Sequence, residues 1–258
     1  MPLGITIAPT QSDIQAAMRG FLLSVLPAEI EVIAAQDNRV PEPQIGNFVI
    51  MTPIRFERLD TNLDTFQDST FSGTVDGDQL TVVSFSHGKI EIGSLLTGDG
   101  VPDGTLVTAG PADGALGVYT INSDISIPVA QTFHAGAKIL QINARSTIQL
   151  DFHSEDYSAA QNAQTTALML RDLYATDYFA ALAEPRNRIT PIHADQVAQR
   201  PFINDQQQYE WRWVAEAVLQ VNQRIVVPQQ FAQEIDVDLI VVDVITVQGG
   251  TAMGVGPP

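Results

Sequence analysis

The sequence predicts an α+β protein in which a mixed sheet with two main helices is interrupted by an inserted β-rich module. Eleven of the 18 glycines lie between about Thr70 and Gly136, and none of the 11 arginines does. The flanking segments alternate apolar and polar residues as strands do, or repeat apolar residues at helical spacing. This change of composition indicates a module set into a surface loop, because loop-closure entropy costs only about 0.6 kcal/mol per doubling of loop length.

We therefore divide the chain into three parts. The body is expected to comprise residues 1–67 and 139–248 and to form one discontinuous α/β domain. The module comprises residues 68–138 and is expected to be an all-β unit, sandwich-like or barrel-like. Residues 249–258 are rich in glycine and proline and read as a C-terminal tail.

The overall composition excludes several classes of protein. Cysteine is absent, so disulfides and thiolate metal sites are excluded, which suits a reducing cytosol. The first residues lack the basic and apolar regions of a signal peptide, and the strongest apolar run, 239–242, is too short to span a membrane. We therefore expect a soluble protein without a membrane partner. With a formal net charge of −17 and only two lysines, Lys89 and Lys138, the chain is not expected to hold nucleic acid through its phosphates.

The first part of the body is predicted to contain a helix and two strands. Ser12 can cap a helix that ends near Val25. Its apolar stripe at helical spacing consists of Ile14, Met18, Phe21, Leu22 and Val25. Residues 29–34 alternate as a short strand, 38–43 form a proline-stiffened extended connector, and 48–56 form a strand that runs toward the module.

The module reads as short strands separated by turns. Turn chemistry is supplied by the Asp-Gly, Gly-Asp-Gly and Pro-Asp-Gly sequences at 76–77, 98–100, 102–104 and 113–114. The strands predicted between them are 80–85, 105–108 and 117–121. This spacing favours a small antiparallel sandwich or barrel without helices.

The second part of the body begins with a strand, 140–152, in which Ile148, Leu150 and Phe152 share one face. An Ala-rich helix is predicted from about Ser158 to Tyr174, and 185–201 reads as an irregular loop.

Two strands, 209–226 and 235–241, are predicted to close the chain. The first would extend roughly 60 Å at about 3.3 Å per residue, which is longer than a domain of this size needs for its own core. Either it bends at a bulge or part of this hairpin reaches a neighbouring subunit. We favour the second interpretation, because a long exposed edge invites pairing with another chain.

The sequence contains no established catalytic motif, and we predict no enzymatic activity, catalytic residue, metal or cofactor. Asp151, His153 and Glu155 share parity at a strand end and could converge on a divalent metal. We favour the interpretation that they form the solvated face of that strand.

The turn 98–104 lacks the alternating acidic ligands of a calcium loop. The row Tyr209, Trp211 and Trp213 could stack sugars or bases, but its period of two favours a place in the core.

Several body segments together resemble the neck terminator, or gateway, proteins of long-tailed bacteriophages. The resemblance rests, in order along the chain, on residues 13–15, 21–23, 38–43, 48–53, 147–152, 201–204 and 207–213. The module separately resembles a β unit that occurs as an insertion or decoration in many phage structural proteins. That resemblance rests on residues 71–75, 80–82, 92–93, 97–101, 104–105 and 117–121.

The resemblance implies a terminator-like fold that assembles into a homohexameric ring at the phage head–tail junction. Such a ring would cap the tail tube, contact the tail tube protein and the head-side connector or collar proteins, and let double-stranded DNA pass during ejection. The protein would then be a virion component that is assembled in the host cytoplasm. An acidic bore would repel the passing DNA, and Asp236 and Asp238 are the candidates to line it. The candidates for the subunit interface are Tyr209, Trp211, Trp213, Arg212, Arg39 and Pro41.

A second functional class stays open. In it, the chain is a tail or capsid accessory protein whose module binds carbohydrate or another virion surface. A metal-assisted hydrolase around Asp151, His153 and Glu155 is the third and least favoured hypothesis, and it requires a bound metal.

Overall fold

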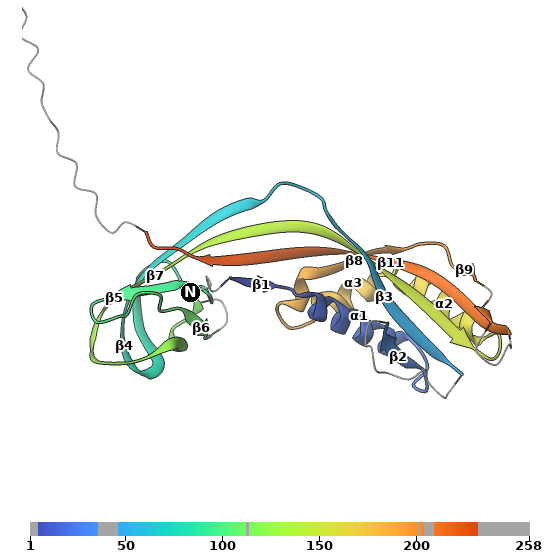
Figure 1. The fold of residues 1–258 in the computed structure, drawn as a ribbon, viewed down its shortest axis with the longest axis horizontal. Coiled ribbons are helices and arrows are strands. Elements are labelled where there is room, and N and C mark those ends of the chain that lie inside the picture. The colour runs from blue at the N-terminus through green and yellow to red at the C-terminus, as the bar shows by residue number, and fades with distance from the viewer. Residues whose placement is uncertain (1–4, 36–45, 112–113, 201, 204–208, 232–258) are drawn as a thin grey trace, which may run out of the picture.

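The computed structural model describes residues 5–35, 46–111, 114–200, 202–203 and 209–231. It is a mixed α+β structure with two lobes joined by a ribbon of long strands (Figure 1). The helices are α1 (Gln11–Val25), α2 (Ser158–Met169), α3 (Leu173–Ala180) and the short 3₁₀ helix η2 (Arg186–Arg188). The strands are β1 (Thr6–Ala8), β2 (Glu31–Ala34), β3 (Phe48–Arg58), β4 (Leu63–His87), β5 (Leu95–Gly98), β6 (Val107–Ala109), β7 (Gly117–Ser154), β8 (Ile189–Ala194), β9 (Ala198–Gln199), β10 (Phe202–Ile203) and β11 (Tyr209–Pro228).

Strand β7 is the central element of the structure. It is 38 residues long and runs from the module into the body. On one side it pairs antiparallel with β11 over its body half and with β5 and β6 over its module half. On the other side it pairs antiparallel with β3 and then with β4. The shorter β2 adds parallel to β3, and β1 adds antiparallel to β11.

The body is organised around a core between the sheet and the three α-helices, which lie on the same side of it (Figure 1). Leu150 and Phe152 of β7 and Ala215 to Val221 of β11 supply the sheet side, as their alternation predicts. Phe21 of α1 is fully buried and contacts Phe179 of α3, with ring centroids 5.7 Å apart. Among the described residues, no helix is long and apolar enough to cross a membrane.

The module has its own cluster of buried side chains. Phe71 of β4 stacks on Phe133 of β7 at a centroid distance of 5.9 Å, and Tyr119 and Leu80 are also fully buried. The buried face of β7 changes from odd-numbered residues at Phe133 to even-numbered ones in the body. Strands twist along their length, so both lobes lie below the ribbon in the view of Figure 1.

The prediction of short, separate strands in the module is wrong for two of the three strands, whereas residues 105–108 overlap the short β6, Val107–Ala109. Residues 80–85 belong to the 25-residue β4, and 117–121 belong to β7, so both strands pass through the expected boundaries at 67/68 and 138/139. Asp76-Gly77 was predicted to form a turn, but it lies inside β4 next to a register shift, where Gly77 has a φ of 64°. A bulge needs the same backbone conformation as a turn, so glycine alone does not tell them apart.

The helix predicted from Ser158 to Tyr174 is two helices. The first ends at Met169, and Asp172 begins the second by accepting a hydrogen bond from the Tyr174 backbone at 2.9 Å. The structure therefore has three α-helices where two main ones were expected. Likewise, 185–201 is not wholly irregular, because it contains η2, β8 and β9, the two strands being paired with β11.

Helix α1 begins two residues earlier than predicted, with Thr10 rather than Ser12 as its cap. The Thr10 hydroxyl accepts from the Asp13 backbone, and the Asp13 carboxylate accepts from the Thr10 backbone at 2.9 Å, which forms a capping box. Burial acts to raise the pKa of Asp13, but the hydrogen bonds from Thr10 and the nearby Arg186 guanidinium outweigh it, so the net pKa lies below its usual value.

Replacing Asp13 by asparagine is expected to make stability less sensitive to acid. A lowered native pKa means that the carboxylate stabilises the fold above its unfolded pKa and loses this contribution as the pH falls through the native value. Urea unfolding at pH 7 and pH 3 measures this, with a loss of about 1 kcal/mol expected at pH 7. Thr10→Ala is the control for the capping contacts. An equal acid dependence in Asp13→Asn and the parent chain would show that Asp13 does not contribute.

Candidate assembly surface

A continuous exposed stretch of the sheet edge is the most distinctive surface of the body. We name residues 54–66 the edge segment; it comprises the end of β3, the connection 59–62 and the start of β4, and every one of its residues is exposed. It carries five large hydrophobic side chains that are 44–60% exposed: Ile54, Phe56, Leu59, Leu63 and Phe66. Apolar side chains gathered along one edge are typical of an interaction surface.

The backbone of the edge segment is paired on one side only. Its residues in β3 and β4 pair with β7, and β2 covers β3 only from Phe48 to Met51. Within the described ranges, no strand pairs with the other side of residues 54–66. Unpaired N–H and C=O groups therefore remain along this edge, ready to pair with an added strand.

The edge segment is held in place by the connection between β3 and β4. The Leu59 backbone donates to the Asn143 carbonyl at 2.9 Å, and the Asn143 side chain donates to the Asp60 carboxylate at 2.5 Å. Arg58 closes the same turn by donating to the Asp60 carbonyl at 2.6 Å. These contacts tie the connection to β7, so the edge has a defined shape before any partner binds.

The last described residues of the chain approach the same edge. The Gln229 backbone donates to the Gly136 carbonyl at 3.1 Å, and the ring of Phe231 meets that of Phe66 edge-on at 6.2 Å. The ammonium of Lys138 lies over the ring of Phe66, 5.8 Å from its centroid, and is 2.7 Å from the carboxylate of Asp64. The chain therefore leaves the described structure next to the edge segment.

Two members of the aromatic row that was expected at a subunit interface, Trp211 and Trp213, lie on the body core. Trp211 and Trp213 of β11 are partly buried and pack against the core, and the ring of Trp211 is 4.5 Å from that of Tyr157. Tyr209 begins β11 and pairs with Ile203 of β10. The two tryptophans are placed as the core interpretation predicts, the side chain of Tyr209 lies outside the description, and a role of the row between subunits stays a prediction.

Arg212 is held by a carboxylate of its own chain. Its guanidinium donates to Asp151 at 2.6 and 2.9 Å, and Gln149 donates to the other oxygen of Asp151 at 2.7 Å. The Asp151 side chain is only 5% exposed, and that of Arg212 is 29% exposed. Asp151 is therefore a buried carboxylate with its charge balanced across two strands.

The metal hypothesis for Asp151, His153 and Glu155 receives no support from their surroundings. The His153 ring stacks on Phe48 at 4.6 Å with a 7° angle between the ring planes, and Asp151 is bound to Arg212. The part of the chain that the structure describes contains no group of three or more His, Asp or Glu side chains that could hold a metal ion. The favoured alternative, a solvated strand face, is also wrong, because Asp151 and His153 are buried.

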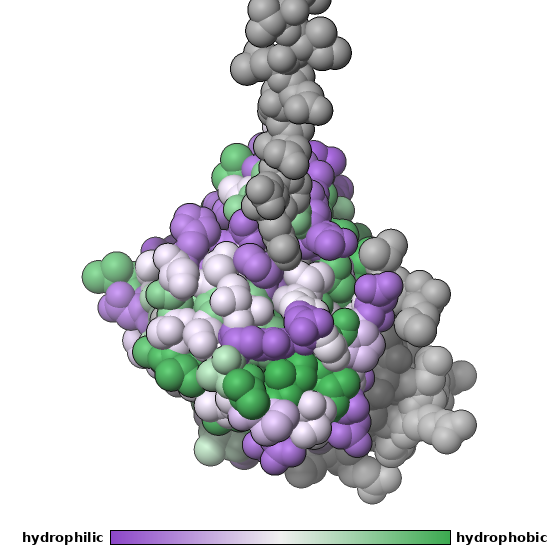
Figure 2. Space-filling view, turned by 90° about the vertical axis from the view of Figure 1, so that its left-hand side faces the viewer, coloured by the Kyte–Doolittle hydropathy of each residue, from purple (hydrophilic) through white to green (hydrophobic). Residues whose placement is uncertain are grey.

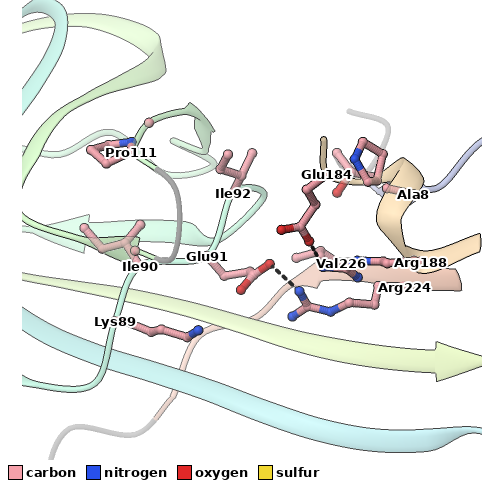
Figure 3. Close-up of a pocket in the computed structure, with 14 residues that line it drawn as sticks. Ala8, Lys89, Ile90, Glu91, Ile92, Pro111, Glu184, Arg188, Arg224 and Val226 are labelled. Atoms are coloured by element: carbon pink, nitrogen blue, oxygen red, sulfur yellow. Dashed lines mark hydrogen bonds and ion pairs between the residues drawn. The ribbon is translucent and has the colours of Figure 1, made fainter. Parts of the chain in front are cut away.

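A cleft of about 520 Å³ lies between the two lobes. Its walls come from the module at 89–92, 110–111 and 114, from the end of β11, and from the turn before η2 (Figure 3). Glu91 of the module points toward Arg224 of β11, 3.2 Å away, and Glu184 pairs with Arg188 on the opposite wall (Figure 3). The Glu91–Arg224 ion pair joins the module to the body across this cleft.

Comparison with known proteins supplies the identification. The sequence model of one family, described as phage neck terminator protein, matches residues 102–250, which is more than half of the chain. The chain belongs to the phage neck terminator family. No curated protein matches it at the significance required. Family membership supports a structural role in the phage neck or tail, and places the protein in the virion with other head or tail proteins as partners.

The terminator match extends over the last part of the module, all of β7, the helices α2 and α3, and β11. The edge segment of this neck terminator lies before the matched range. The sequence identified residues 48–56 as a strand, but it did not show that the residues beyond Pro53 stay exposed. Their mixture of Ile, Phe and Leu with Arg and Asp is equally typical of a half-buried strand.

Four of the predicted site residues lie outside the described residues. These are the interface candidates Arg39 and Pro41 and the bore candidates Asp236 and Asp238. The predicted strand 235–241 lies outside them as well. The first strand of that hairpin, β11, is confirmed, and it is paired with β7 from Trp211 to Pro228. The backbone of β11 is thus paired within the chain over this range, and contact of the hairpin with a neighbouring subunit stays a prediction.

Proposed function

We propose that this neck terminator forms a homohexameric ring at the head–tail junction of the virion. The ring caps the tail tube and joins it to the head-side connector or collar proteins. The match to the neck terminator family over residues 102–250 carries this proposal. The edge segment supports it, because a preformed, exposed, apolar sheet edge is suited to contacts between copies.

The charge of the chain suits a channel for DNA. Double-stranded DNA carries a negative charge about every 1.7 Å along its axis, and a bore lined with lysine and arginine would bind it at many points. The formal net charge of each copy is −17, so a ring of several copies repels a passing duplex at short range. Asp236 and Asp238 remain the candidates to line the bore, and the DNA would pass without sequence-specific contacts.

We expect the purified chain, or the chain mixed with its tail tube protein, to give a hexamer by native mass spectrometry. Particle images by electron microscopy should show a central opening wide enough for a DNA duplex. The measurement is made at two protein concentrations, because assembly by mass action should increase the ring fraction at the higher one. A chain that stays monomeric in every mixture, or a ring without an opening, would contradict the proposal.

A second role is supported by the surface of the module. Hydrophobic side chains gather on the end of the module that faces the viewer in Figure 2. Among the described residues of the module, the large hydrophobic side chains that are more than half exposed are Val83, Leu116, Val118 and Val129, all of them aliphatic. Carbohydrate sites use aromatic rings, so this surface favours another virion protein over a glycan as the ligand of the module. A glycan array separates the two, since only a carbohydrate-binding module would give a signal.

A further inference from the structure

The outer side of the edge segment has no paired strand in the described part of the chain, so the segment could accept an added strand. Natural proteins protect such edges with lysines, prolines, bulges or a covering element. Residues 54–66 begin at a register shift between Pro53 and Arg55 and carry five charged residues, but they contain neither lysine nor proline, and five of their side chains are exposed hydrophobics. We propose that this edge receives residues 234–245 of a second copy of the chain as an added β-strand. This inference rests on the proposed assembly of several copies.

The sequence of 234–245 has the properties of a donor strand. It reads Glu-Ile-Asp-Val-Asp-Leu-Ile-Val-Val-Asp-Val-Ile, which is dominated by β-branched residues. At about 3.3 Å per residue it extends roughly 40 Å, which matches the length of the edge segment. Adding a strand to an open edge gives affinity through backbone hydrogen bonds and specificity through alternate side chains.

The first half of the donor and the β3 part of the edge segment have corresponding faces. Phe56 and Phe66 are paired with Ser146 and Lys138, both even-numbered residues of β7, so they lie on one face of the sheet. Arg55, Glu57 and Leu63 are paired with odd-numbered residues of β7 and lie on the opposite face, whereas Arg58 and Asp64 share the face of the phenylalanines. In the donor, Ile235, Val237, Leu239 and Val241 share one face with Asp243, and Glu234, Asp236 and Asp238 share the other with Ile240, Val242 and Val244. The first half of the donor can thus place Ile235 and Val237 beside Phe56 while Asp236 and Asp238 lie beside Arg55.

The direction of the chain favours a second copy over the chain's own edge. Both β11 and β4 are antiparallel to β7, so both run from the body toward the module. To pair with its own edge segment, the chain would have to reverse shortly after Phe231, where it leaves the described structure beside Phe66. Residues 232–234 are Ala-Gln-Glu and contain no Gly, Pro, Asn or Asp for a tight reversal. The direction of β11 points past the chain's own edge segment, so a second copy is the occupant that the strand directions favour.

The absence of cysteine makes a disulfide test direct. Chains with Phe56→Cys are mixed with chains carrying Val237→Cys, Leu239→Cys or Val241→Cys, and the mixture is oxidised and run on a non-reducing gel. These three donor positions share one face, so they cover different registers of the added strand, and a disulfide requires Cα atoms within about 7 Å. We expect at least one mixture to give at least tenfold more heterodimer than a mixture containing Val129→Cys, a control residue of the module that is 75% exposed.

Two further outcomes overturn the inference. One is the lack of any heterodimer above the control level. The other is a disulfide that forms only inside single chains carrying Phe56→Cys together with one donor cysteine, because the occupant would then be the chain's own segment.

A truncated chain that ends at Phe231 separates this inference from the proposed function. It is expected to keep its circular dichroism spectrum and to lose at least tenfold in ring fraction at the concentration where the full chain assembles. If the truncated chain forms the same ring as the full chain, strand exchange is wrong and the ring stands. If the full chain itself forms no ring with its tube protein, the proposed function fails first.

Discussion

Replacing Arg212 by alanine is expected to lower the free energy of unfolding by about 3 kcal/mol, because the substitution leaves the Asp151 carboxylate buried without its countercharge. Asp151 is only 5% exposed, and Arg212 supplies two of its hydrogen bonds. Gln149 still donates to the other oxygen, and Arg212 is itself 29% exposed, so the lower end of the range for buried pairs applies. Urea unfolding followed by tryptophan fluorescence measures the change.

The matched control is Arg186→Ala, which removes an exposed arginine 3.4 Å from Asp13. Exposed ion pairs contribute only about 0–1 kcal/mol, so the difference between the two variants isolates the effect of burial. If Arg212→Ala keeps the stability of the parent chain and loses ring formation, then Arg212 acts between subunits, as the sequence first suggested.

The parts of the fold that were predicted correctly are those in which a local pattern decides the structure. The alternation of Ile148, Leu150 and Phe152 places one face of β7 against the core, and the period-two run in β11 does the same. In these strands one face is buried by helices, so the sequence has to alternate. The likeness to neck terminators was also predicted, and the family match confirms it.

The features that were missed depend on partners far away in the sequence. Asp151 looks like a solvent-facing residue until Arg212, 61 residues later, is placed beside it on the next strand. His153 is covered by Phe48 of β3 in the same way. Each of two further residues carries a local signal that fits two structures. Gly77 fits a turn or a bulge, and Asp172 fits the interior of a helix or its N-cap. Only the tertiary structure decides between them.

The candidate assembly surface also combines a feature that a local sequence pattern indicated and one that depends on distant parts of the chain. The sequence directed attention to the end of the chain, where an alternating segment suggested pairing with a neighbour, and this segment is the donor in our inference. The acceptor was not foreseen, because exposure of residues 54–66 depends on β2 ending at Ala34 and leaving the rest of β3 uncovered. No pattern within 54–66 itself reveals that the partner strand is missing.

Replacing Phe133 by alanine is expected to destabilise the module by about 3–5 kcal/mol while leaving the body folded. Phe133 is fully buried against Phe71 in a cluster separate from the body core, and both tryptophans, Trp211 and Trp213, lie in the body. Circular dichroism, which reports all strands, should therefore show an earlier transition in the variant, whereas the midpoint from tryptophan fluorescence should not move.

The matched variant is Phe21→Ala, which opens a cavity of the same kind in the body core and should shift the tryptophan midpoint strongly. The comparison tests the division of the chain at 67/68 and 138/139, because β4 and β7 run through both boundaries without interruption. Continuous strands can couple two cores, and the Glu91–Arg224 ion pair adds a contact across the cleft. If the two variants shift the tryptophan midpoint equally, the lobes unfold as one cooperative unit, and the module is an extension of the terminator sheet rather than a domain of its own.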